Sequence, residues 1–139
     1  MLQLKKFPDL PLSTLEEDKN EKAELFSGLL DDKNIADITV IDVSEVYTEC
    51  DLFIIGTALN ERNARAVCDY VEEKAEENGF VKNGIEGYDE GKWILMDYSD
   101  VIVHIFIRSE RTLFNLEKLW SSGQFLDMRS RIRDRNREE

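Results

Sequence analysis

The segment Glu86–Trp120, EGYDEGKWILMDYSDVIVHIFIRSERTLFNLEKLW, is the most informative part of this chain for its fold. It contains two strongly apolar runs, near 92–97 and 101–107, joined by the turn Asp97-Tyr98-Ser99-Asp100. Apolar, β-branched runs separated by Asp and Ser predict a β-hairpin. A last helix should follow it, with Ser109 as its cap, because apolar residues then recur every three or four positions: Leu113, Leu116, Leu119 and Trp120.

Upstream of this segment, the pattern predicts two helices and three further strands. A helix over 14–33 is favoured by the capping-box spacing of Ser13 and Glu16, and a second helix follows Asn60 and stops at Asn78-Gly79. Strands are expected over 38–43, 52–57 and 80–85, the second buried on both faces. The expected fold is therefore a single α/β domain, a mixed sheet of about five strands with helices packed on its faces.

Three parts of the chain differ in pattern. Residues 1–12 carry two prolines and predict a flexible N-terminal segment, residues 13–121 form the domain, and residues 122–139 read as a polar, arginine-bearing tail, disordered or a frayed helix. An RNA-touching role for this tail stays open. The 139 residues, 42% of them apolar, suit one core.

Charge and cysteine content narrow the function classes. The formal net charge of −12 disfavours nonspecific nucleic-acid binding and favours a basic partner. Two cysteines outside any CxxC pair, and no signal sequence, indicate a reduced, cytoplasmic protein. No apolar run approaches the roughly 20 residues that span a bilayer.

Polar residues around the hairpin allow two kinds of site. His104 is the sole histidine, and with Glu86, Asp97 and Asp100 it would give an oxygen-rich metal site or a nucleotide- or metal-dependent enzyme. The simpler interpretation makes His104 a hydrogen-bonded structural residue and the aspartates turn caps. No phosphate loop, nucleophile motif or Asp-x-Asp in a predicted strand is present, so we expect no catalytic residue, metal or cofactor.

The sequence resembles the Iojap-related ribosomal silencing factor family over roughly residues 20–121. The resemblance rests on EG at 86–87, WILMDYSDVIVH at 93–104 and LEKLW at 116–120, and upstream on ADI at 36–38, DLFII at 51–55 and the helix with Arg62 and Asp69. Ala58 and Ser99 stand where the family usually has glycine, and Asn60-Glu61 replaces a Ser-Ser pair. Asn60 still suits a helix cap, and Ser99 suits a turn without positive φ.

The resemblance implies a nucleotidyltransferase-like fold without catalytic equipment, usually a homodimer. It implies binding to a basic ribosomal protein, number fourteen of the large subunit, at the intersubunit face. Such binding would block subunit joining and repress translation, and the family is also connected with large-subunit maturation. A dimeric scaffold acting away from ribosomes is a further alternative.

The expected contact combines an apolar centre with an acidic ring. Trp93, Leu95 and Tyr98 form the centre, and Glu117 and Trp120 extend or brace it. The ring that pairs with Lys or Arg of the partner consists of Glu86, Asp89, Asp97 and Asp100. Neither a membrane nor sequence-specific nucleic-acid binding is expected.

Overall fold

The structure is a computed structural model that describes residues 12–129 and 131–132. Most of the predicted N-terminal segment and residues 133–139 of the predicted tail lie outside this part of the chain, as do the side chains of Ser13 and Glu16. Within it the elements are α2 (Leu12–Asp32), β1 (Ala36–Asp42), β2 (Leu52–Ala58), α3 (Glu61–Glu77), β3 (Gly84–Glu86), β4 (Trp93–Asp97), β5 (Val101–Ile107), α4 (Arg108–Phe114), α5 (Leu116–Leu119) and β6 (Gln124–Leu126).

The described strands form one mixed sheet in the order β3-β4-β5-β2-β1-β6. β2 and β5 are parallel, and the other neighbours are antiparallel. The α/β class and mixed sheet predicted from the sequence are confirmed, with six described strands where about five were expected. The sixth is β6, at the edge beyond β1.

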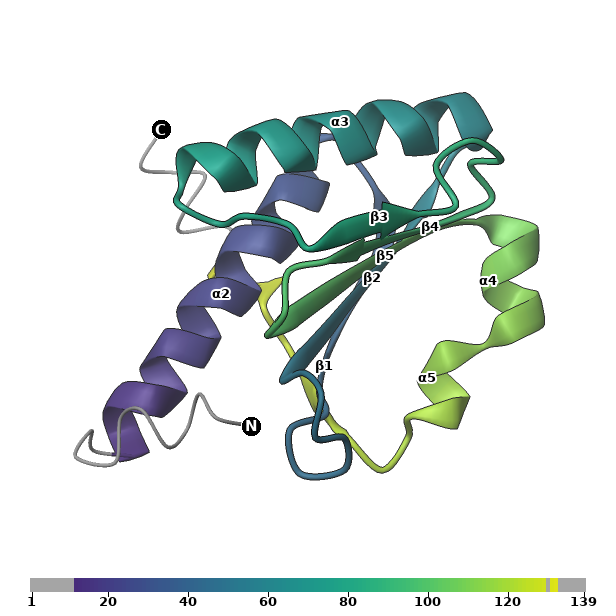
Figure 1. Cartoon of the computed structure of the whole chain (residues 1–139). Coiled ribbons are helices and arrows are strands. Elements are labelled where there is room, and N and C mark those ends of the chain that lie inside the picture. The colour runs from purple at the N-terminus through teal and green to yellow at the C-terminus, as the bar shows by residue number, and fades with distance from the viewer. Residues whose placement is uncertain (1–11, 130, 133–139) are drawn as a thin grey trace.

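The sheet has two unequal faces (Figure 1). The long helices α2 and α3 cover one face, which we call the helical layer, and α4 and α5 lie over the other, the short-helix face. Strand alternation divides the core accordingly: Ile94, Met96 and Val103 pack in the helical layer, whereas Phe53 and Phe106 pack on the short-helix face. Two short helices cover less of a sheet than two long ones, and this leaves room for a functional surface.

Local signals were most reliable for α3 and the hairpin. Asn60 caps α3 by accepting the backbone N–H of Asn63 at 2.8 Å, and the stripe Ala64, Val67, Cys68, Val71 and Ala75 is buried as predicted. β4 and β5 pair antiparallel, which confirms the hairpin. Ser99 in its turn has φ +73°, so the expectation that this turn avoids positive φ was wrong.

Three other predictions need correction. The strand expected over 80–85 is the short β3, Gly84–Glu86. The last helix breaks at Asn115, whose left-handed conformation (φ 47°, ψ 58°) separates α4 from α5, and α4 begins without a side-chain cap from Ser109. Leu113 and Leu119, placed in its apolar stripe, are 70% and 69% exposed, so the expectation that they face the core was wrong.

The predicted tail begins inside the fold. β6 pairs with Val40–Asp42 of β1, and Met128 is buried in the helical layer. Arg131 donates to Glu24 of α2 at 2.9 Å. The expectation of a disordered or frayed segment is therefore wrong for these residues. Pairing with a strand more than 80 positions away leaves no local signal in sequence.

Candidate functional site

Three of the predicted contact residues lie together on the short-helix face. Trp93, Leu95 and Asp97 alternate with buried residues along β4 and are half-buried. Leu95 lies between two cross-strand partners: exposed Glu86 of β3 on one side and His104 of β5 on the other. The site is thus an apolar strip with a carboxylate at its edge.

Trp93 is held from three directions. Its indole Nε1–H donates to Nδ1 of His104 at 3.0 Å. The ring stacks on Phe106 with centroids 4.9 Å apart, and Phe114 at the end of α4 contacts it at 4.7 Å. A half-exposed tryptophan with its N–H satisfied inside the protein is a rigid, mostly apolar anchor.

His104 is 4% exposed, and burial alone lowers its pKa from 6.5 to about 4. It is therefore neutral near pH 7. Because Nδ1 accepts from Trp93, the ring proton is on Nε2, and this buried N–H has no hydrogen-bond partner among the described residues. An unpaired buried donor costs about 1–3 kcal/mol. The contacts made by His104 agree with the prediction of a hydrogen-bonded structural histidine.

Tyr98 does not belong to this surface. It is 6% exposed and packs on Phe26 of α2, with ring centroids 4.9 Å apart, in the helical layer. Burial raises the pKa of its hydroxyl to about 12. Tyr98 is separated from Ile94 and Met96 by an even number of positions, so strand alternation in the sequence already placed it on their face, opposite to Trp93 and Leu95.

The predicted acidic ring is divided between two sides of the molecule. Asp97 lies on the short-helix face, and its Oδ1 accepts the Ser99 N–H at 2.8 Å, so it also caps the turn. Asp100 instead forms an ion pair with Lys22 of α2 at 2.9 Å. Asp89 is exposed, and Arg65 of α3 donates to its carbonyl at 3.1 Å. Glu86 and Asp97 are therefore the ring members beside Leu95 and Trp93.

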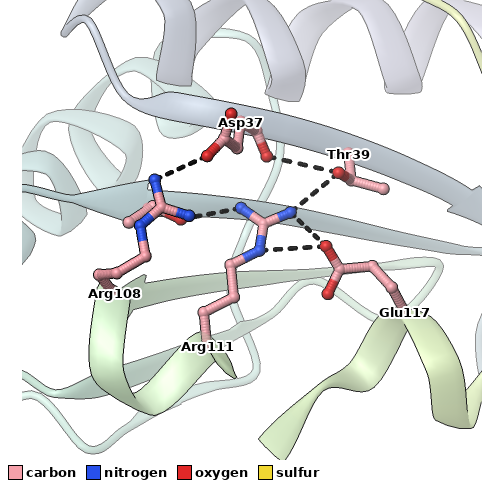
Figure 2. A network of polar contacts seen from close by, with 6 residues as sticks. Asp37, Thr39, Arg108, Arg111 and Glu117 are labelled. Carbon is pink, nitrogen blue, oxygen red and sulfur yellow. Dashed lines mark hydrogen bonds and ion pairs between the residues drawn. The ribbon is translucent and has the colours of Figure 1, made fainter. Parts of the chain in front are cut away.

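Glu117 of α5 belongs to a polar network centred on Arg111 (Figure 2). Its carboxylate accepts two N–H groups of Arg111, whose guanidinium is buried between the helices and the sheet. Arg111 also donates to Thr57 of β2 and Thr39 of β1, each at 2.9 Å. This network attaches α4 and α5 to the sheet. The sequence did not predict this role of Arg111, because its partners lie on three separate elements.

An aromatic cluster supports the other end of the site. Trp120 is half-buried and packs against Phe53 and Tyr47, with centroids 5.1 Å away in each case. Tyr47 was missed because it lies in a loop without periodicity. Beyond the cluster, Leu119 and Phe114 are 69% and 45% exposed and extend the apolar surface over α4 and α5.

The described residues do not assemble the alternative metal site. They contain no group of three or more His, Cys, Asp or Glu side chains placed to hold a metal ion. Asp100 faces Lys22, whereas His104 is enclosed by rings on the opposite face. None of the helices in the described part of the chain is long and apolar enough to cross a membrane.

Comparisons with known proteins agree on one family. The family model described as "Ribosomal silencing factor during starvation" matches residues 16–139. Ribosomal silencing factor RsfS of Bacillus subtilis is 33% identical over 111 residues, which cover 78% of this chain and 94% of that protein. A Mus musculus protein named "Mitochondrial assembly of ribosomal large subunit protein 1" is 30% identical over 114 residues, 78% of this chain and 49% of its own length.

Solved structures show the same fold. A crystal structure from Bacillus halodurans superposes with a TM-score of 0.68 at 30% identity and covers 77% of this chain and 97% of that chain. A crystal structure from Chromobacterium violaceum gives 0.69 at 29% identity, covering 75% and 85% respectively.

Proposed function

This chain belongs to the ribosomal silencing factor family, and we propose that it represses translation by binding the large ribosomal subunit. The contact is ribosomal protein number fourteen at the intersubunit face, where a bound protein sterically excludes the small subunit. Support comes from relatives named as ribosomal silencing factors and from one named for assembly of the ribosomal large subunit. The proposal includes a role in large-subunit maturation, in the cytoplasm.

One observation carries the choice of surface: half-exposed Trp93 is held rigidly beside Leu95 on the face with the shorter helices. Tryptophan is enriched among residues that dominate binding energy, especially where packing has already fixed its position. Trp120 and Phe114 continue this apolar surface on either side. The proposal includes a homodimer, because exposed Leu113 and Leu119 add apolar area on α4 and α5 that a second copy of the chain could cover.

Electrostatics favour a basic protein as the partner. The formal net charge is −12, and the contact surface has Glu86 and Asp97 at its edge. Charges at such an edge raise the association rate and select the partner more than they add affinity. Exclusion of the small subunit requires no chemical step, only enough affinity to compete for the same face.

Gradient sedimentation with isolated ribosomal subunits tests this function. The purified protein is expected to migrate with the large subunit alone and to reduce joined ribosomes under subunit-joining conditions. Absence from every ribosomal fraction at moderate salt would contradict the proposal, and binding to the small subunit alone would do the same.

A matched pair of aspartate variants tests the surface. Asp97→Asn should weaken binding to the large subunit by up to about fivefold, because it removes an edge charge while its amide oxygen still accepts the Ser99 N–H. Asp100→Asn removes the same charge from a residue paired with Lys22, and should leave the affinity within about twofold. Affinities come from sedimentation titrations at fixed salt. Equal effects of the two changes would place the contact elsewhere.

A further inference from the structure

His104 is a neutral but polar residue of β5 that is buried among apolar side chains of the neighbouring strands. Leu95 lies beside it on β4 and Ile55 on β2, and its ring contacts Phe53 and stacks with Phe106. An aliphatic side chain would fill this place without leaving a polar atom unpaired. Among the described residues, its side chain forms one hydrogen bond, in which Nδ1 accepts the indole N–H of Trp93, so the residue's distinctive contribution is that bond.

The hydrogen bond constrains Trp93 in a way that ring packing does not. Phe106 and Phe114 restrict the plane of the indole, but dispersion contacts tolerate sliding and rotation within that plane. A hydrogen bond of 3.0 Å is directional, and it directs the Nε1 edge inward toward the sheet. The bond therefore fixes which edge of the partly exposed indole faces His104 and which faces away from it.

We propose that His104 is a positioning residue for recognition: its Nδ1 atom holds Trp93 in the orientation that the ribosomal partner binds. This inference rests on the proposed function and assigns a role within the same surface. An anchor held in its bound orientation before contact loses less conformational freedom on association. His104 itself does not touch the partner, since its side chain is buried.

A purely structural histidine would affect folding without affecting the orientation of Trp93, and three variants separate the two roles. His104→Leu keeps an apolar filling and removes the acceptor. His104→Asn places a carbonyl oxygen on Cγ, where histidine carries Nδ1, so it retains an acceptor for the indole. Val103→Ala is the matched control, because Val103 is the adjacent buried residue on β5 but packs in the helical layer.

The first measurement is affinity for isolated large ribosomal subunits at a temperature where circular dichroism shows every variant folded. His104→Leu should bind about tenfold more weakly, because Trp93 must then be ordered during binding. His104→Asn should recover most of that loss, and Val103→Ala should bind like the wild type. In a Trp93→Phe background, His104→Leu should have little further effect, because the bond it removes is already absent.

The second measurement is hydrogen exchange of the Trp93 indole N–H by NMR, assigned through Trp93→Phe. Slow exchange is expected in the wild type and in His104→Asn, and fast exchange in His104→Leu. The inference is overturned if His104→Leu binds like the wild type while its indole exchanges rapidly, or if it weakens binding equally in both backgrounds. If the wild type itself does not bind the large subunit, the proposed function fails, and the unchanged exchange pattern would show that the bond exists.

Discussion

At the scale of single residues, the buried imidazole of His104 links the fold to pH. Burial lowers its pKa from 6.5 to about 4, so the unfolded chain binds a proton in this interval that the folded chain does not. The stability tied to the neutral ring is complete above pH 6.5 and is lost as pH falls to about 4. Its size is on the order of 3 kcal/mol.

The wild type should therefore lose stability between pH 6.5 and 4 more steeply than His104→Leu. Chemical denaturation at half-unit pH intervals measures the free energy of unfolding of both. Burial and the nearby Asp100 raise the pKa of Asp51, so its contribution to the pH dependence of stability has the opposite sign. This contribution is the same in both proteins and does not affect their comparison. If plots of unfolding free energy against pH ran parallel for the two proteins, the pKa of His104 would not be lowered by folding.

At the scale of elements, Arg111 decides how α4 and α5 are held against the sheet. Arg111→Met should lower the free energy of unfolding by about 3 kcal/mol, because it leaves Thr39, Thr57 and the Glu117 carboxylate without their donor. Hydrogen exchange in α4 and α5 should increase more than in β5. Denaturation and exchange measurements together test the prediction.

Arg108→Met is the matched control for this change. Arg108 also pairs with a carboxylate, Asp37, but both side chains are about 60% exposed, at 61% and 59%. An exposed pair of this kind contributes at most about 1 kcal/mol. If both substitutions lowered the free energy of unfolding equally, burial of the Arg111 network would not be what stabilises α4 and α5.

At the scale of the whole molecule, the last described residues pack against elements from the first part of the chain, β1 and α2. Met128 and Ile132 pack in the helical layer, and Arg131 reaches Glu24 on α2. Met128→Ala should lower the free energy of unfolding by about 2 kcal/mol or more, since it opens a cavity in the helical layer. Val81→Ala, at a side chain 79% exposed, should change stability by less than about 0.5 kcal/mol. Thermal unfolding compares them, and a matching pair of melting temperatures would mean that the segment is not anchored.

Sequence reasoning succeeded where the signal was local. The stripe of α3, its Asn60 cap and the continuous burial of β2 each follow from spacing within one segment. The pairing of Trp93 and Leu95 on one face follows from strand alternation, and the same rule would have excluded Tyr98. The turn residues suggested the hairpin but not the positive φ of Ser99.

Local patterns in the chain were enough to predict the α/β class, the order of most elements and the family, because period, capping and turn chemistry act over a few neighbouring residues. Three features became visible only in the folded chain: which acidic residues lie near Trp93, the pairing of β6 with β1, and the contacts of Arg111 and His104 beneath the short-helix face. These outcomes depend on contacts between segments far apart in the chain. Register, burial and helix placement determine them jointly, and no local pattern records that combination.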